Sequence, residues 1–265
     1  MPRTNGNGQQ TPLIQSLDRG LVILEAVAKS NEPVSLGDLT GILGIDRSSV
    51  FRLASTLRRR GFLAYPTGRK EYILGPSIWR LSRQYDWSNM LIRVSHEHLK
   101  ALASTTNETA HLAIREGRQA LFIDHVATNH VISVAGQTGE LVPLYCTAHG
   151  KALLADLERR DLRAIFGSGA LRTYTKETCS SLDDLARICT RIKSDGYATD
   201  DGEFQEGIRC VAAPIRTGGN VIIGSIGISA PQLRFPLERY PVCAEQVVEV
   251  ARQITQRLLT HADES

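Results

Sequence analysis

Two short amphipathic runs joined by a tight turn, between Ser35 and Arg60, constrain the fold more than any other part of the chain. Ser35 stands three positions before Asp38, a spacing that predicts a capping box and a helix that ends at Gly44. Asp46 then predicts the start of a further helix, which continues to Arg60. Two short helices joined by a glycine-containing turn form the helix-turn-helix pattern.

The second of these helices has two faces of different chemistry. At about 100° per residue, one face is apolar, and it comprises Val50, Leu53, Ala54 and Leu57. The opposite face carries hydroxyls and guanidiniums and no acid. Hydroxyls approach phosphates and bases closely, and arginine binds phosphate or guanine. We therefore predict a DNA recognition helix with these contacts: Arg47, Ser48, Ser49, Arg52, Ser55, Thr56 and Arg59.

The segments on either side extend this pattern. Leu17, Leu21, Leu24 and Ala28 recur at helical spacing and predict an amphipathic first helix. After Gly61, the run FLAYPTGRKEYIL predicts a hairpin with Arg69 and Lys70 at its tip. A helix-turn-helix followed by a hairpin is a winged helix, and these two cations then contact phosphate or the minor groove. The alternative is a two-stranded lid with incidental charges.

Charge is unevenly distributed along the chain. From Arg47 to Arg83 there are nine basic residues and one acid, Glu71, which leaves 22 basic and 27 acidic residues elsewhere. A basic module attached to an acidic one is typical of a DNA-binding protein. A solvated basic face is the alternative explanation of the charge alone.

Length and composition indicate two domains of ordinary globular type. The 265 residues are 42% hydrophobic and 22% charged. No apolar run is long enough to cross a membrane, and five scattered cysteines without a C-x-x-C pair fit a reducing cytoplasm. The predicted divisions are a disordered tail (1–12), a winged helix-turn-helix domain (13–75), a linker helix (76–90) and an effector-binding domain (91–260).

The C-terminal part alternates between the two periodicities. Runs suited to strands lie at 109–117, 119–127 and 130–136, and helical patterns follow them. Two further strand-like runs, CVAAPIRTG and NVIIGSIGISA, predict a hairpin around Gly218-Gly219-Asn220. Hairpins interrupted by helices indicate an α+β domain with a largely antiparallel sheet.

The order and amino-acid sequences of these segments resemble those of the IclR family of bacterial regulators from about Ser16 to Leu259. The likeness rests on SLDRGLVILEAVA, IDRSSVFRLASTLRRRGFL, LVPLYCTAHGKALLA and GYATDDGEFQEGIRCVAAPI, and on the spacing of Gly196, Asp200, Glu203, Gly207, Cys210, Ala212 and Pro214. The resemblance implies a GAF-like domain that binds a small effector, a helical linker, and dimers or tetramers on palindromic operators. It implies either a repressor or an activator.

The same resemblance implies an effector site. Mapped residue by residue, it comprises Ala148, His149, Asp200, Cys210, Gly227 and Ser229, with Glu203 from the shared motif. Val131, Val134, Val142 and Leu144 are expected to supply apolar walls. Main-chain N–H groups at the helix start near Ala148 favour an anionic group such as a carboxylate. The predicted effector is an organic acid or an aromatic metabolite.

Each of these residues also has a plainer interpretation. Cys210 can be a small buried hydrophobe, and Asp200 and Glu203 can cap a turn. His149 stands where the family has a small residue, so it narrows the pocket, adds a hydrogen-bond donor or points elsewhere.

Two other classes of protein remain as alternatives. The chain has no G-x-S-x-G, H-E-x-x-H or G-x-G-x-x-G motif, and His96 and His98 diverge on a helix, so we predict no catalytic residue, metal or cofactor. An enzyme that uses a metal or acid/base groups in the pocket is one alternative. An architectural DNA-binding protein without a ligand is the other.

Overall fold

The structure, a computed structural model, describes residues 13–30, 32–66, 68–82, 86–128, 130–131, 133–134, 136–217 and 220–263. The predicted N-terminal tail, residues 1–12, lies outside the described residues. The chain divides into two compact units, residues 1–86 and 87–265, which we call the head unit and the sheet unit. Each unit contains an apolar core of its own.

The head unit is a winged helix-turn-helix. The capping box of Ser35 and Asp38 is present, Gly44 ends the second helix in the left-handed conformation, and the Asp46 side chain caps the third, so all three local predictions are confirmed. A two-residue strand pair follows, and Val34 forms a bridge to Tyr72 beside it. The elements are α1 (Gln15–Lys29), α2 (Leu36–Leu43), α3 (Arg47–Arg59), β1 (Leu63–Ala64), β2 (Ile73–Leu74) and α4 (Pro76–Ser82).

The buried face of α1 differs from the predicted one. Ile23 and Val27 are buried with Gly20, whereas Leu17 and Leu21 are exposed. The apolar stripe of this helix is wider than one face, and α2 and α3 cover the side that carries Ile23. The predicted helix is correct, and Leu24 of the predicted stripe packs against this core, but periodicity alone did not identify Ile23 and Val27 as the buried residues.

The sheet unit has an antiparallel sheet of six strands in the order β5-β4-β3-β8-β7-β6. This arrangement confirms the predicted α+β class and the β7–β8 hairpin; Gly218 and Gly219 of its predicted turn lie outside the described residues. The elements are α5 (Asp86–Thr106), β3 (Thr109–Glu116), β4 (Gln119–Val126), β5 (Leu141–Pro143), α6 (Ala148–Leu153), α7 (Arg159–Phe166), α8 (Leu182–Asp195), β6 (Ala198–Asp201), β7 (Ile208–Arg216), β8 (Ile222–Pro231), a 3-10 turn (Leu237–Arg239) and α9 (Tyr240–Asp263).

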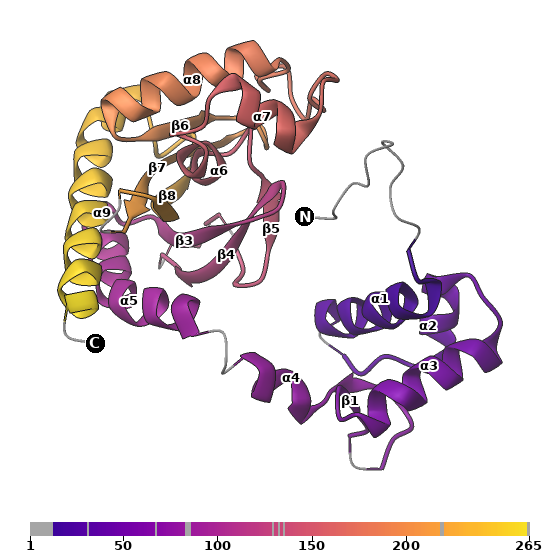
Figure 1. Cartoon of the computed structure of the whole chain (residues 1–265). Coiled ribbons are helices and arrows are strands. Elements are labelled where there is room, and N and C mark those ends of the chain that lie inside the picture. The colour runs from indigo at the N-terminus through magenta and orange to yellow at the C-terminus, as the bar shows by residue number, and fades with distance from the viewer. Residues whose placement is uncertain are drawn as a thin grey trace. The chain divides into compact units, whose positions relative to one another are not determined.

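Helices cover both faces of this sheet. In Figure 1, α5 and α9 lie together on one side and α6, α7 and α8 lie on the other. Because side chains alternate along a strand, Leu112, Val211 and Ile228 pack under α5 and α9. Their neighbours His111, Cys210 and Ser229 therefore face the side of α6.

Two predicted element boundaries are wrong. The expected strand at 130–136 is absent among the described residues of that range, and β4 pairs instead with β5, nearer to α6. The linker helix predicted at 76–90 falls on α4, described to Ser82, and on the first residues of α5, described from Asp86; residues 83–85 lie outside the described residues, and α5 runs past Leu91 without a break. No glycine or proline lies between Ser88 and Ile92, so nothing local stops this helix. Within the described ranges, no helix is both long and apolar enough to cross a membrane.

Candidate nucleic-acid interface and effector cavity

The position of α3 is fixed by its cap and by its apolar face. Val50 and Ala54 are buried in the head core. At its start, the Asp46 carboxylate accepts hydrogen bonds from the Ser48 hydroxyl (2.6 Å) and from the Ser49 N–H (2.9 Å). These hydrogen bonds hold the pKa of Asp46 well below its usual value. A charged cap at this end stabilises the helix that presents the opposite face to solvent.

All the predicted contact residues of α3 reach solvent. Arg47, Ser48, Arg52, Thr56 and Arg59 are exposed, and Ser49 and Ser55 are half-buried. Thr56 donates its hydroxyl proton to the Arg52 carbonyl (2.8 Å), and the Arg52 guanidinium lies 3.4 Å from the Ser49 hydroxyl. The outer face of α3 is thus a polar and cationic surface whose side chains are available to another molecule.

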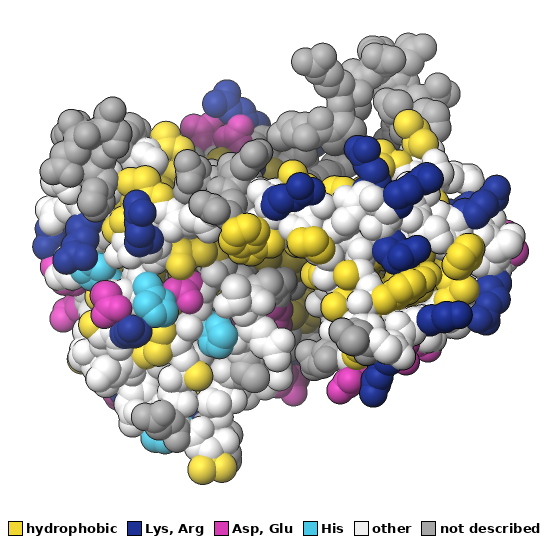
Figure 2. All heavy atoms as spheres, turned by 90° about the horizontal axis from the view of Figure 1, so that it is seen from below, with side chains coloured by type: hydrophobic (Ala, Val, Ile, Leu, Met, Phe, Trp, Pro, Cys, Tyr) yellow, Lys and Arg dark blue, Asp and Glu magenta, His cyan; other side chains and the backbone are white. Residues whose placement is uncertain are grey.

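Two further arginines, Arg60 and Arg80, were absent from the contacts predicted from the sequence. They line one groove of the head unit together with the predicted Arg59 and with Phe62 and Ser77. Figure 2 shows Lys and Arg side chains spread over the head unit, on the right of the view, among apolar side chains. Three guanidiniums around one groove suit a phosphate group. A basic surface next to a recognition helix is the arrangement that binds a DNA backbone.

The hairpin brings two cations to the same unit. Arg69 and Lys70 are exposed beside Gly68, whose φ of 81° allows the turn. Arg69 lies 3.6 Å from Glu71 in an exposed ion pair, so its charge is partly compensated within the wing, whereas Lys70 forms no ion pair within the described part of the chain.

In the sheet unit, the residues on the α6 side of the sheet enclose a cavity of about 70 Å³. Of the residues predicted for the effector site, seven line it: Val134, Val142, Ala148, His149, Asp200, Cys210 and Ser229. Eight others complete the lining: His111, Phe122, Gly136, Glu140, Thr147, Phe204, Gln205 and Ile208. The alternation of β3 would have indicated His111, because Leu112 on the other face is apolar and buried.

Four predicted residues do not line the cavity. Val131 is fully exposed, and Leu144 is buried in the apolar core between the sheet and α7. A side chain at Gly227 would place its Cβ 2.3 Å from the Val211 carbonyl oxygen, so this glycine serves the close pairing of β7 and β8. Glu203 lies behind the cavity wall, where it pairs with the buried Lys151.

Aromatic rings form one wall of the cavity. His111 stacks on Phe122 with ring centroids 4.7 Å apart, and His149 contacts both rings edge-on at 5.9 Å and 5.3 Å. His149 is buried, and its Nδ1 lies 3.1 Å from the Ser225 hydroxyl. Of the three possibilities for His149, the structure shows that it points inward and narrows the cavity. Burial lowers the pKa of His149 to about 3, and it also lowers the pKa of His111.

The opposite wall contains a buried acid. One Asp200 oxygen accepts the Glu203 N–H at 2.8 Å, so Asp200 caps the turn after β6 and lines the cavity as well. Burial raises the pKa of Asp200 to about 7, against the opposing effect of the nearby Lys151 ammonium. Cys210 donates to the Ser229 hydroxyl at 3.2 Å, and burial raises the pKa of its thiol. A protonated thiol of this kind is a packing group and a weak donor.

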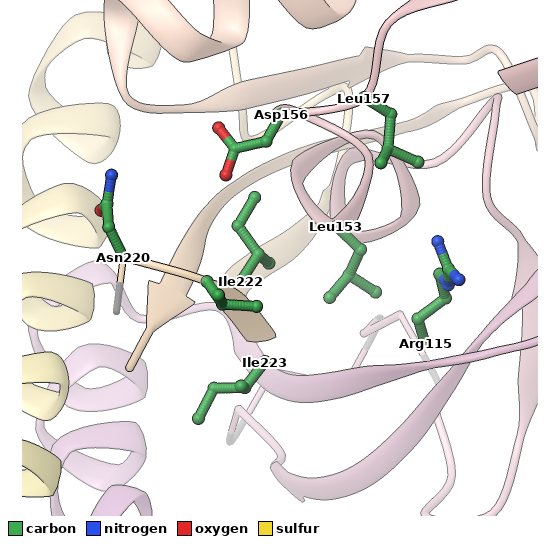
Figure 3. A pocket seen from close by; sticks show the side chains of 8 residues that line it. Arg115, Leu153, Asp156, Leu157, Asn220, Ile222 and Ile223 are labelled. Atoms are coloured by element: carbon green, nitrogen blue, oxygen red, sulfur yellow. The ribbon is translucent and has the colours of Figure 1, made fainter. Parts of the chain in front are cut away.

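A second hollow at the far end of the sheet lacks these features. It is an open groove between Arg115 and Asp156, and Figure 3 shows Leu153 and Ile222 at its centre. Asp156 receives two hydrogen bonds from Arg216, of 2.5 Å and 3.1 Å. Across the described chain, no group of three or more His, Cys, Asp or Glu side chains is arranged to hold a metal ion.

The two units correspond to two known domains. Residues 16–66 match the IclR helix-turn-helix domain, and residues 85–256 match the bacterial transcriptional regulator IclR C-terminal domain. The chain belongs to the IclR family. It is 28% identical over 247 residues to the transcriptional repressor IclR of Escherichia coli K12, with 92% of this chain and 90% of that protein covered.

Solved structures of IclR-type proteins share the architecture. A putative transcriptional regulator from Rhodococcus sp. RHA1 matches 93% of this chain and 98% of its own with a TM-score of 0.76 and 27% identity. An IclR homologue from Microbacterium hydrocarbonoxydans in complex with 4-hydroxybenzoate matches 92% of this chain and 98% of its own with a TM-score of 0.79 and 20% identity. The head unit is thus an IclR-type DNA-binding domain and the sheet unit an IclR effector-binding domain.

Proposed function

We propose that this IclR-type regulator binds a specific operator through α3 and that a small effector in the cavity of the sheet unit controls its affinity for that operator. The observation that carries the proposal is the capped α3, whose exposed face holds hydroxyls and arginines without an acid. Base-specific contacts in the major groove fall to Arg52 and its neighbours, and Arg69 and Lys70 contact the backbone.

The cavity lining separates the two effector classes that the sequence suggests. Two acids, Asp200 and Glu140, are among the described lining residues, and none of those residues is lysine or arginine. The stacked rings of His111 and Phe122 offer a flat apolar wall. This lining favours an aromatic metabolite over an organic acid. The ligand of the distant homologue, 4-hydroxybenzoate, is both a ring and a carboxylate, so that complex supports a ring-shaped ligand and does not support the exclusion of acids.

The regulator acts as a dimer or tetramer on a palindromic site. The head unit exposes four large apolar side chains, those of Leu13, Ile14, Leu17 and Leu21. Exposed apolar side chains of this kind support self-association through the head unit. A dimer places two α3 helices in successive major grooves, about 34–36 Å apart. Effector binding changes the spacing of the heads, with a coupling free energy of about 1–3 kcal/mol.

Selection of bound sequences from random duplex DNA tests this proposal, because it requires neither the operator nor the effector in advance. The expected product is an inverted repeat that the full-length protein binds. A library of small metabolites is then screened for compounds that change its affinity for that repeat, and each active compound is checked for chemical turnover. If folded protein enriches no sequence, the proposal that it is a sequence-specific regulator is refuted. If the protein turns the compound over, it is an enzyme instead. A reporter gene behind the operator gives the sign of regulation, for which the Escherichia coli relative, a repressor, favours repression.

A further inference from the structure

Two buried imidazoles of the cavity have ring nitrogens without a hydrogen-bond partner. The atoms are Nδ1 of His111 and Nε2 of His149, and both residues are at least 98% buried and line the same cavity. A buried polar atom left without a partner is destabilising. The two rings come from different elements, β3 and α6, so a single ligand can meet both.

Burial keeps the His149 ring neutral at pH 7, so one of its two nitrogens carries a proton. Nδ1 lies 3.1 Å from the Ser225 hydroxyl, an oxygen that can accept a hydrogen bond from this nitrogen or donate one to it. With the proton on Nδ1, Nε2 presents a lone pair to the cavity and requires a donor. This protonation state belongs to the proposal and is tested with it.

Charge in the cavity points in the same direction. Glu140 and Asp200 are the only ionisable side chains besides the two histidines and Cys210 among the described lining residues. The nearest ammonium, Lys151, does not line the cavity and is already paired with Glu203. A carboxylate in this cavity has no free cation among the described lining residues to neutralise it, and burying an unpaired charge is expensive. An uncharged molecule avoids that cost.

The size of the cavity limits the ligand further. At about 10–15 Å³ for each water, it has room for roughly five waters, which is the space of a single six-membered ring with one substituent. This is below the range of about 300–1,000 Å³ for ordinary ligand pockets. Gly136 closes the cavity over His111, since a Cβ there would lie 2.2 Å from the His111 ring.

We propose that the cavity selects a small uncharged ring that donates a hydrogen bond, of the phenol type, to Nε2 of His149, and that it discriminates against carboxylates. The inference rests on the proposed function in so far as the cavity is the effector site. When the hydroxyl of a ligand donates to His149, the ring of that ligand also packs against the aromatic wall that His111 and Phe122 form.

Three matched probes test the proposal with the full-length protein at pH 7.5. Phenol is uncharged and donates, anisole has the same ring without the donor, and benzoate carries the charge. Dissociation constants are measured by ligand-observed NMR and by the shift in unfolding temperature. We expect phenol to bind about tenfold more tightly than anisole or benzoate, because one hydrogen bond to a buried acceptor contributes about 1.4 kcal/mol.

Two variants assign the effect to the proposed atom. His149→Phe keeps the ring packing and removes both nitrogens, so phenol should lose its tenfold advantage over anisole. His125→Phe is the control, because His125 stacks on His111 at 6.3 Å but does not line the cavity. Should His149→Phe unfold, nitrogen-15 NMR of the wild-type protein still decides the point, with Nε2 expected as an unprotonated acceptor.

Several outcomes overturn the proposal. These are benzoate binding as tightly as phenol, phenol binding unchanged by His149→Phe, a protonated Nε2, and no binding of phenol at millimolar concentration. Operator binding without any probe is measured in the same preparations. Intact operator binding alongside any of these outcomes refutes the ligand class alone, whereas loss of operator binding in folded wild-type protein refutes the proposed function and leaves the probe result valid.

Discussion

The outer face of α3 and the cavity of the sheet unit are both polar, but they are built in opposite ways. The α3 face comes from thirteen consecutive residues with a cap of its own at Asp46. The cavity is assembled from β3, β4, β5, α6, β6, β7 and β8, so residues as distant as His111 and Ser229 meet in it. The first is exposed and cationic, and the second is buried and lacks a cation among its described residues.

This difference has an energetic consequence. Exposed side chains on a capped helix change little when one of them is replaced, because solvent accommodates the replacement. A buried polar cavity depends on close main-chain contacts around it and on groups whose charge state burial controls. Variants of the sheet unit should therefore alter stability, and variants of the α3 face should alter binding.

The largest effect is expected for Gly150→Ala, on α6. A Cβ at this position would lie 2.3 Å from the Leu144 carbonyl oxygen, so α6 must move and the sheet unit should lose about 3 kcal/mol of stability. Hydrogen exchange followed by peptide locates the loss. Gly41→Ala is the matched control, because nothing lies within 4 Å of a Cβ on that helix of the head. If Gly150→Ala lowered the stability of both units equally, the conclusion that each unit has an independent core would be contradicted.

Asp200→Asn should change how the stability of the sheet unit depends on pH. The pKa of Asp200 is raised to about 7 in the fold, so the wild-type protein loses stability as the pH rises from about 4 to 7, where the unfolded chain ionises first. The Asn variant should lack this loss, so its stability relative to wild type should rise by roughly 2–3 kcal/mol between pH 5 and pH 8. Urea unfolding at pH 5 and pH 8 measures it, with the exposed Asp195→Asn as control. Parallel curves for Asp200→Asn and wild type would show that this acid is not buried as described.

Arg52→Ala should weaken operator binding by about 1–3 kcal/mol if the guanidinium contacts a base. Its stability should be unchanged, because the side chain is exposed and bonded only to Ser49. Fluorescence anisotropy on the selected operator measures the affinity, and circular dichroism checks the fold. Arg19→Ala, on α1, serves as a control for the loss of one positive charge. An unchanged affinity would remove Arg52 from the base contacts.

The smallest effect is expected for Asp46→Ala, which removes the cap of α3. Loss of the hydrogen bonds from Ser48 and Ser49 should cost the head unit about 1 kcal/mol. The sheet unit should be unaffected, and operator affinity should fall only as far as α3 frays. Hydrogen exchange of the α3 amides measures the change beside Glu25→Ala on the exposed side of α1. Equal protection in both variants would mean that the cap contributes nothing.

Much of the head unit could be predicted from the sequence because its signals are local. A capping box, a glycine in the left-handed conformation and a cap at Asp46 each depend on a few neighbouring residues. The sequence did not predict which face of α1 is buried, because Leu17 and Ile23 are equally apolar and only the packing of α2 and α3 decides between them.

Less of the cavity could be predicted, because strand pairing decides which residues face it. His111 faces the cavity since β3 pairs with β8, which sets Ala110 opposite Ile228 under the other layer of helices. Val131 was misplaced because the run 130–136 has strand-forming residues but no strand partner in its described part. The family resemblance predicted Asp200, Cys210 and Ser229 as lining residues, whereas the aromatic wall could be recognised only in the folded structure.

The central claim is that the α3 face distinguishes one DNA sequence from others. The most direct test is the ratio of dissociation constants of the full-length protein for its selected operator and for a scrambled duplex, measured at two salt concentrations. The account predicts a preference of at least about 10³-fold for the operator, with both affinities falling steeply as salt rises. Equal binding to the two duplexes by folded protein would contradict it.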